Sequence, residues 1–206
     1  MFAEGSKNKF QHNPDGTTFI FLETKNKYFP GKHTAIIDTE DWDKVREYRW
    51  GIRGDYYVSV SIPHPDGSWH YYIREGKEAR RRRRTTLSLH HLILGKPKKG
   101  MVVDHINHNG LDNRKENLRF ATATQNQQNR RNQVGSSSKY KGVSWNKRER
   151  RWRAQVHVGA ECIHLGWFTC EYQAALAYNK KAIELHGEFA NLNVVPEEYI
   201  IKYNNV

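Results

Sequence analysis

The sequence has little cysteine and no long apolar run. Its 206 residues include two cysteines, Cys162 and Cys170, which are too few to staple a chain of this size or to form a four-cysteine zinc site. No stretch approaches the roughly 20 apolar residues that span a bilayer, and residues 1–11 lack the apolar core of a secretory signal. These absences exclude a membrane span, a secreted disulfide scaffold and a cysteine-rich zinc protein. We therefore expect a soluble intracellular protein.

Acidic residues are also scarce, and the scarcity is local. The chain has 34 Lys and Arg residues against 22 Asp and Glu residues, a net charge of +12. Residues 77–153 hold 21 of the basic and 5 of the acidic residues, a local net of +16. Basic charge of this density favours a nucleic-acid partner, because it releases counterions from the phosphate backbone. A membrane surface is a poorer partner, because the basic residues do not follow one amphipathic helix.

The run Arg80–Arg84 is the densest part of this charge. It is either a solvated loop or a set of phosphate contacts. On the second interpretation, the candidate DNA contacts in the run are Arg81, Arg82 and Arg83.

Shifts in composition along the chain predict an α+β protein of several modules. The expected parts are a β-rich N-terminal module for DNA binding or support (1–94), a polar central segment (95–132), a short linker (133–138), a compact third unit (139–193) and a tail (194–206).

The N-terminal module is expected to contain one short helix over 41–48, capped by Asp38 or Thr39. Strands over 56–62 and 69–73 are expected to pair as a hairpin through the turn-rich segment 63–68. A further strand is expected over 85–89. The histidines that follow, His90 and His91, are expected to be packed rather than catalytic. The aromatic residues expected in the core are Trp42, Tyr48, Trp50, Tyr56 and Tyr57.

The central segment is rich in Asn, His, Asp and Arg, so it needs a metal or a polar network to hold its fold. A β-branched run leads into Asp104 and His105, and Thr122 or Thr124 is placed to cap a helix that carries Asn126. The oxygen ligands Asp104 and Asn126 suit Mg²⁺ or Mn²⁺ better than zinc. An imidazole beside such a metal can deprotonate water, and Asn117 can hold the ring of His105.

The stretch VDHINHNGLDNRKENLRFATATQNQQN resembles the HNH (ββα-metal) nucleases of phage and group I intron homing endonucleases. The resemblance covers residues 87–132. It implies that His105 is the general base, that Asn117 orients it, and that Asp104 and Asn126 bind one Mg²⁺ or Mn²⁺ ion. Asn126 replaces the third conventional histidine, as in one branch of the family. The resemblance also implies products with 5′-phosphate and 3′-hydroxyl ends.

In the third unit, residues of strand 151–158 alternate between two faces, and the neighbouring segments divide in the same way. The alternation predicts a three-stranded antiparallel sheet with one apolar and one basic face. A helix over 170–186, capped by Thr169, is expected to cover the apolar face. The stripe that would do so is Ala175, Tyr178, Ala182 and Leu185.

The segments KYKGVSWNKRERRWRAQVHV, HLGWF and AALAYNKKAIELHGEFANLN resemble the AP2 DNA-binding domain, over nearly all of 139–193. Carried across, the sheet-borne base contacts fall at Ser144, Asn146, Gln155, His157, Cys162 and His164. The expected phosphate contacts are Arg148, Arg150, Arg151 and Arg153. Several of the base-contact positions differ from those of the plant factors, so their base preference is not transferred.

Together these features predict a site-specific DNA endonuclease of the homing type. We expect it to act on double-stranded DNA as a monomer on an asymmetric target, with no membrane partner, in the cytoplasm of a bacterial or phage-infected cell. The alternative is a non-catalytic, sequence-specific DNA-binding regulator with a degenerate HNH centre. The complete set Asp104, His105, Asn117 and Asn126 favours the enzyme, because gripping phosphates does not require it.

Overall fold

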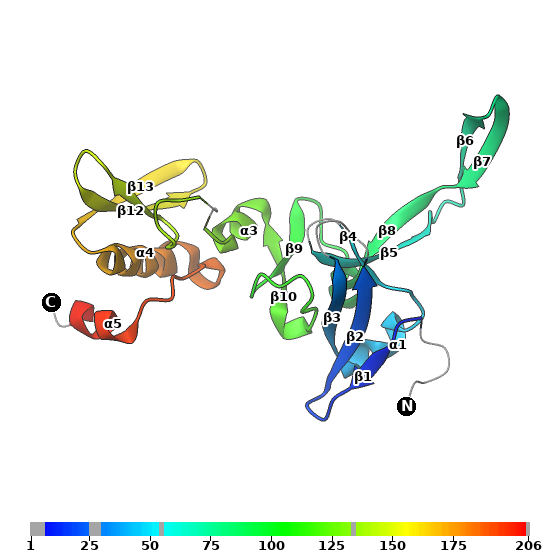
Figure 1. The fold of residues 1–206 in the computed structure, drawn as a ribbon, viewed down its shortest axis with the longest axis horizontal. Helices are drawn as coiled ribbons and strands as arrows, with labels where there is room; N and C mark the ends of the chain where they lie inside the picture. Colours follow the sequence, from blue (N-terminus) through cyan, green and yellow to red (C-terminus); the bar gives the residue numbers. More distant parts are fainter. Residues whose placement is uncertain (1–6, 25–29, 54–55, 133–134, 205–206) are drawn as a thin grey trace. The chain divides into compact units, whose positions relative to one another are not determined.

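A computed structural model describes residues 7–24, 30–53, 56–132 and 135–204. Positions 133–134 of the expected linker and 205–206 of the expected tail lie outside the described residues. The chain forms two compact units (Figure 1). The first contains residues 1–99 and 103–120, and the second contains residues 100–102 and 121–206. Both combine helices with short antiparallel strands, which confirms the α+β class.

The first unit begins with an antiparallel sheet in the order β1-β2-β3: β1 (Phe10–His12), β2 (Thr17–Thr24) and β3 (Gly31–Asp38). Along β2 every second side chain is buried, and Ile20 and Leu22 are the apolar ones. Ala35 and Ile37 on β3 are buried with them. This alternation gives the sheet one face for the core.

The sheet is followed by a helical turn that is shorter than the sequence predicted. It consists of η1 (Thr39–Asp41) and α1 (Trp42–Val45). Neither Asp38 nor Thr39 makes the expected side-chain cap, because the Asp38 carboxylate accepts a hydrogen bond from the Lys115 backbone instead. The core position of Trp50 is confirmed, since its indole is buried and donates to the carbonyl of Val45 at 2.9 Å.

The expected hairpin between strands 56–62 and 69–73 is wrong. Four strands instead form two pairs, in which β5 pairs with β8 and β6 with β7: β5 (Tyr57–Pro63), β6 (Trp69–Arg74), β7 (Lys77–Arg82) and β8 (Arg84–Ser88). The reversal is made by Glu75 and Gly76, both at positive φ, the conformation that two-residue hairpins require. The arginine run therefore lies largely in strands, not in a loop.

The rest of the first unit links this sheet to the polar segment. A third strand, β4 (Gly51–Arg53), completes the sheet β4-β5-β8. The expected strand over 85–89 is confirmed except for Leu89, which begins a helix and is fully buried in the core. Tyr57 is 43% exposed, so it is not the core residue expected. The remaining elements are α2 (Leu89–Leu94), β9 (Met101–His105), η2 (Lys115–Asn117) and β10 (Leu118–Thr122), with β9 and β10 paired.

The second unit contains a three-stranded antiparallel sheet in the order β11-β12-β13, as predicted. Its apolar face packs on α4, where Ala175, Tyr178 and Ala182 are buried and Leu185 is half-buried. Residue Cys170, not Thr169, precedes this helix, without a side-chain cap. The elements are α3 (Ala123–Asn129), β11 (Val143–Asn146), β12 (Arg151–Val158), β13 (Glu161–Phe168), α4 (Glu171–His186), η3 (Gly187–Phe189) and α5 (Glu197–Asn204).

Hydrogen bonds hold α3 within this second unit. The ammonium of Lys141 donates to the carbonyls of Gln128 and Arg130 at the C-terminal end of α3, and burial lowers the pKa of Lys141 to about 8. The hydroxyl of Ser138 donates to Glu171 at 2.6 Å. The two hydrogen bonds from Lys141 satisfy carbonyls at the end of α3 that have no partner within the helix.

Gly142, just before β11, packs against α4 and generates the first prediction. Its φ is 73°, and an added Cβ would overlap the Tyr178 ring and the Gln155 carbonyl oxygen. We expect Gly142→Ala to lower the free energy of unfolding of the second unit by about 2 kcal/mol more than Gly159→Ala. Gly159 has a similar φ of 61° but nothing within 4 Å, so it controls for backbone strain alone. Urea titrations monitored by tryptophan fluorescence would test this, and equal losses would contradict it.

Candidate active site

The polar loop between β9 and β10 is fastened to the edge of the first sheet. Ile36 on β3 donates its backbone N–H to the carbonyl of Leu111 at 2.8 Å and accepts from the N–H of Asn113 at 2.7 Å. This bridge adds residues 111–113 as a short parallel partner to β3. Gly110 is required beside it, because a Cβ there would lie 2.5 Å from the carbonyl oxygen of Tyr56. The loop therefore has a fixed position on the first unit.

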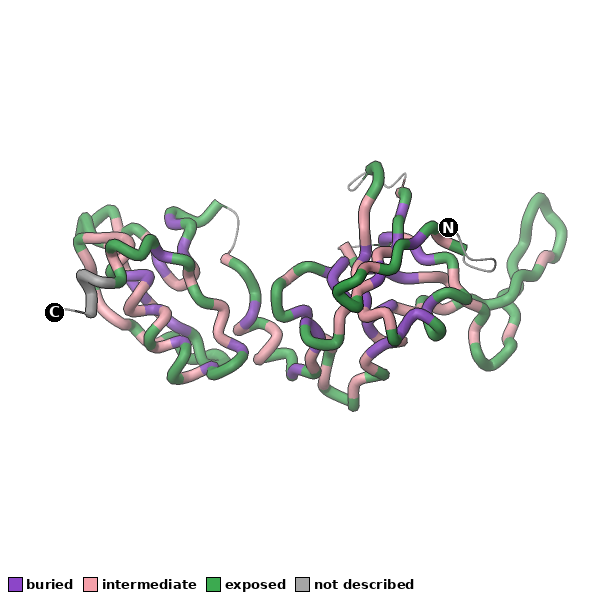
Figure 2. The backbone as a smooth tube through the Cα atoms, turned by 90° about the horizontal axis from the view of Figure 1, so that it is seen from below, coloured by how far each residue is buried: buried purple, intermediate pink, exposed green. Residues whose placement is uncertain are grey.

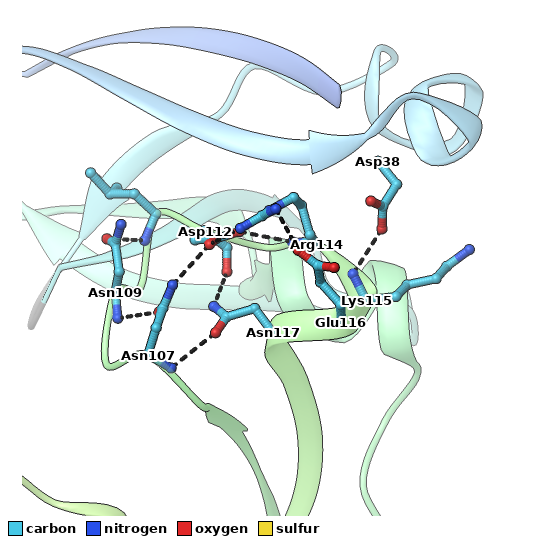
Figure 3. Close-up of polar contacts among 9 residues, drawn as sticks. Asp38, Asn107, Asn109, Asp112, Arg114, Lys115, Glu116 and Asn117 are labelled. Carbon is cyan, nitrogen blue, oxygen red and sulfur yellow. Dashed lines mark hydrogen bonds and ion pairs between the residues drawn. The ribbon is translucent and has the colours of Figure 1, made fainter. Parts of the chain in front are cut away.

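Asp112 is the centre of the polar contacts in this loop (Figure 3). Its buried carboxylate accepts from Arg114 at 2.9 and 2.8 Å and from the Asn107 amide at 2.8 Å. Burial alone would raise the pKa of Asp112, but the hydrogen bonds from Arg114 hold it below its usual value. The same carboxylate raises the pKa of Arg114. A charge-assisted bidentate pair of this kind fixes geometry as well as charge.

Asn117 fastens the two ends of the loop together (Figure 3). Its side-chain oxygen accepts from the backbone N–H of Asn107 at 2.9 Å, and its side-chain nitrogen donates to the carbonyl of Asp112 at 2.8 Å. Its own carbonyl accepts from the N–H of Ile106, one residue after His105. Asn117 thus acts on the backbone that follows His105.

Asp104 and His105 end strand β9 and are both buried, each with 5% of its surface exposed. Arg119 on β10 donates to the Asp104 carboxylate through Nε at 3.0 Å and pairs with it through Nη2 at 2.9 Å. The ion pair offsets the cost of burying this charge. The two side chains therefore lie next to each other in sequence at the end of β9, with Asp104 against Arg119.

The His105 ring is surrounded by Asn113, Tyr57 and His90. Its Nε2 lies 3.4 Å from the Asn113 side-chain oxygen, and the ring centroids of Tyr57 and His90 lie 5.5 and 5.3 Å away. Burial lowers the pKa of His105, against the opposing effects of Asn113, Asp104 and Asp112. Burial also lowers the pKa of His90 to about 3. The packing of His90 is as expected, whereas nothing in the sequence pattern had singled out Asn113.

Asn126 lies on α3 in the second unit, where it is half-buried. The helix begins with a capping box, in which the Thr122 hydroxyl accepts from the N–H of Gln125 and the Gln125 side chain accepts from the N–H of Thr122. Thr122, and not Thr124, is therefore the cap. The role of Asn126 as a metal ligand stays a prediction.

The sheet of the second unit brings the predicted reading residues onto one face. The register pairs Ser144 with Arg153, Asn146 with Arg151, Gln155 with His164, and His157 with Cys162. Arg148 and Arg150 lie in the turn between β11 and β12, where the side-chain oxygen of Asn146 accepts from the N–H groups of Arg148 and Glu149. Asn146 therefore also shapes this turn.

Sequence alternation missed Trp167, which lies on the same face. It pairs with Arg153 and is 38% exposed, with its ring 5.1 Å from that of His164. Simple alternation along β13 puts Trp167 on the apolar side. A register shift between Ala154 and Gln155 reverses the alternation, as an extra residue in one strand does. The sequence feature that could have indicated this irregularity is Gly166, because a glycine within a strand often marks a β-bulge.

The arginines singled out in the basic run lie in and beside the ribbon of β6 and β7. Arg81 and Arg82 are on β7, above the rings of Tyr72 and Trp69 at 5.9 and 5.4 Å. Arg83 lies between β7 and β8, 3.9 Å from Asp66.

Comparison with known proteins identifies the family of the chain. Residues 91–128 match a family model for HNH endonuclease. The chain is 34% identical to a protein described as an uncharacterized HNH endonuclease of Acanthamoeba polyphaga mimivirus, over 80% of this chain and 78% of that one. The chain belongs to the HNH endonuclease family. It is also 33% identical to Protein 3.8 of Escherichia phage T7, over 45% of this chain and 75% of that protein.

The AP2 resemblance of this HNH endonuclease receives weaker support. The chain is 33% identical to the AP2-like ethylene-responsive transcription factor TOE2 of Arabidopsis thaliana over 70 residues, which are 34% of this chain and 14% of that factor. No solved structure matches the chain. No helix in the described part of the chain is long and apolar enough to cross a membrane.

HNH nucleases generally use a divalent metal ion, and the donor chemistry here fits one. Within the described ranges, no three His, Cys, Asp or Glu side chains form a group that could hold a metal. The carboxylate of Asp104 and the amide oxygen of Asn126 were expected from the sequence as donors, and that assignment stays a prediction. Such hard oxygen donors suit Mg²⁺ or Mn²⁺. The Asp104 carboxylate already lies against a cation, the guanidinium of Arg119.

The buried Asp112 carboxylate generates a prediction about stability and pH. Its folded-state pKa is lowered, so its contribution is present above the unfolded-state value and is lost as pH falls through the folded-state value. We expect Asp112→Asn to lower the free energy of unfolding of the first unit by about 2 kcal/mol at pH 7, and by less near pH 3. The exposed Asp43→Asn is the control. A loss that is the same at both pH values would contradict the prediction.

Proposed function

We propose that this HNH endonuclease is of the homing type and hydrolyses phosphodiesters of duplex DNA, with His105 as the general base. The main support is the burial of Asp104 and His105 side by side at the end of β9, next to a loop that is fixed to β3. A polar network that only gripped phosphate would have no need to bury a carboxylate and an imidazole together, since burial of each costs free energy.

Asn113 sets the protonation of the base in this proposal. Its side-chain nitrogen donates to the carbonyl of Gly110 at 3.3 Å, which directs its oxygen to His105 Nε2. The Nε2 atom then carries the proton, and Nδ1 is the nitrogen that takes the proton from water. Burial keeps the pKa of His105 low, so the ring is neutral at neutral pH.

Asn117 acts in this scheme as a positioning residue, through the backbone of the loop. Asp104 and Asn126 would hold Mg²⁺ or Mn²⁺, with Asp104 oriented by Arg119. When bound, the cation would stabilise the negative charge that develops on the phosphate and on the departing 3′ oxygen.

The second unit is proposed to read the target as an AP2-like module over 139–193, while residues 95–132 cut and residues 1–94 support DNA binding. Arg153, Gln155 and His157 alternate with the buried Ala154 and Val156 along β12, so they point away from the helix-covered side. A small sheet with such side chains can reach base edges in the major groove. An unequal pair of units suits a monomer on an asymmetric target.

Plasmid nicking in the presence of Mg²⁺ tests the catalytic assignment. We expect His105→Ala to reduce the rate by at least about 100-fold, since a positioned base contributes that much. The control is His108→Asn, because Asn tolerates the positive φ of 60° at that position. Equal nicking by His105→Ala and the wild type would remove His105 from catalysis. If no variant cuts a duplex that the protein binds specifically, the regulator is the better interpretation.

The reading face generates a prediction about specificity. We expect Gln155→Ala and His157→Ala to change the preferred sequence in a binding selection, with little change in salt dependence. Arg148 has a side chain that is 92% exposed in a turn, so Arg148→Ala should weaken binding to all duplexes and reduce the salt slope by about 1. If Arg148→Ala changed the preferred sequence and the variants of Gln155 and His157 changed only the salt dependence, base reading would be assigned to Arg148 and phosphate contact to Gln155 and His157.

A further inference from the structure

The ribbon formed by β6 and β7 is named here the arm, residues 69–82. It extends away from the β4-β5-β8 sheet (Figure 1). Every residue of the arm is exposed except Ala79, which is half-buried, and the arm is coloured almost throughout as exposed in Figure 2. A two-stranded ribbon without a packed face has little stability of its own in water. Its exposure therefore calls for an explanation beyond folding.

A structured bend directs the arm. Backbone hydrogen bonds join His64 to Arg83 at 2.8 Å and Arg83 to Ser68 at 2.9 Å, so the ladder of β5 and β8 continues to the base of the arm. Asp66 fixes the bend, because its carboxylate accepts from the N–H of Ser68 and lies 2.7 Å from the His64 ring. The arm is thus an extension of the sheet with a defined direction.

The register separates two faces of the arm. Trp69 pairs with Arg82, Tyr71 with Arg80 and Ile73 with Glu78, so these six share one face. The opposite face carries His70, Tyr72, Arg74, Lys77, Ala79 and Arg81. The ring contacts agree with this division, because the guanidiniums of Arg80 and Arg82 both lie over Trp69, at 4.7 and 5.4 Å.

The first of these faces presents an apolar row to solvent. Trp69, Tyr71 and Ile73 are 38, 68 and 68% exposed, and they occupy every second position of β6. Scattered exposed apolar residues need no explanation, but a contiguous row on a projecting element marks a binding surface. On the opposite face, Tyr72 is the one large apolar residue among the exposed side chains, beside His70 and the charged residues Arg74, Lys77 and Arg81.

The chemistry of this face fits duplex DNA. The arginines that flank the apolar row belong to the run Arg80–Arg84, which is complementary to a polyanion. The same charges oppose edge-to-edge pairing of the strands of the arm with those of a second copy of the protein, because like charges on edge strands repel. The major groove is about 12 Å wide and admits a two-stranded ribbon, where arginine contacts guanine and apolar groups contact thymine methyls.

We propose that the arm enters the major groove of duplex DNA with Trp69, Tyr71 and Ile73 facing the bases and Arg80 and Arg82 beside them. The arm is then a second reading element, separate from the sheet of the second unit. This inference rests on the proposed action on DNA, but it does not depend on whether His105 is catalytic.

Binding experiments test the arm in the full chain with His105→Ala, on a duplex selected for binding from a random-sequence library. We expect Tyr71→Ala to weaken binding about tenfold, as loss of one good base contact does, and Tyr71→Phe to restore most of it. The control variant is Tyr72→Ala, which removes a tyrosine from the opposite face of the arm. Tyr72 is as exposed as Trp69, at 37 and 38%, so Tyr72→Ala is also matched in exposure to the Trp69→Ala variant. Trp69→Ala should resemble Tyr71→Ala. Circular dichroism would check that each variant is folded.

Dimethyl sulfate protection identifies the groove, because it reports on guanine N7 in the major groove and adenine N3 in the minor groove. We expect Tyr71→Ala to lose guanine N7 protection at one part of the site only. Unchanged affinity, an equal loss with Tyr72→Ala, or protection of adenine N3 instead would overturn the proposal. Loss of self-association with unchanged DNA binding would assign the face to a second copy. If wild-type protein does not cut DNA but these binding results hold, only the nuclease proposal fails.

Discussion

The segment between β9 and β10 contains few apolar side chains, so its shape depends on hydrogen bonds that water would otherwise make. The buried Asp112 carboxylate, which accepts hydrogen bonds from Arg114 and Asn107, is the centre of that network, and the backbone on either side of Asp112 is bonded to β3. A network of this kind fixes one structure only when nearly every member has a partner. The position of His105 depends on it, because Asn113 follows Asp112 directly and contacts the His105 ring.

Much of the fold could be predicted because periodicity is a direct consequence of geometry. Alternation in β12 placed Ala154 and Val156 inside, and the stripe containing Tyr178 lies on the sheet as its spacing requires. Pairing of strands in the first unit could not be predicted in the same way. Segment 63–68 contains Pro, Asp and Gly, which favour a turn, but the positive φ values at Glu75 and Gly76 make the tighter reversal.

The candidate site shows the same division between local and long-range information. The capping of α3 by Thr122 is local and was among the two expected caps. The contact of Asn113 with His105 depends on where the loop lies against β3. That position is set by contacts between residues far apart in the sequence. Likewise, the exposure of Trp167 depends on a register shift opposite β12, and a shift of one residue moves a side chain to the other face.

The neighbours of His105 bear on its proposed role as the general base. His90 packs its ring near that of His105, and burial lowers the pKa of His90 to about 3. It is therefore neutral wherever the protein is folded near neutral pH. A cationic neighbour at 5.3 Å would disfavour proton uptake by His105 during reaction. In the proposed mechanism, the exposed arginines attract DNA, while the neutral ring of His90 adds no positive charge that would oppose protonation of His105.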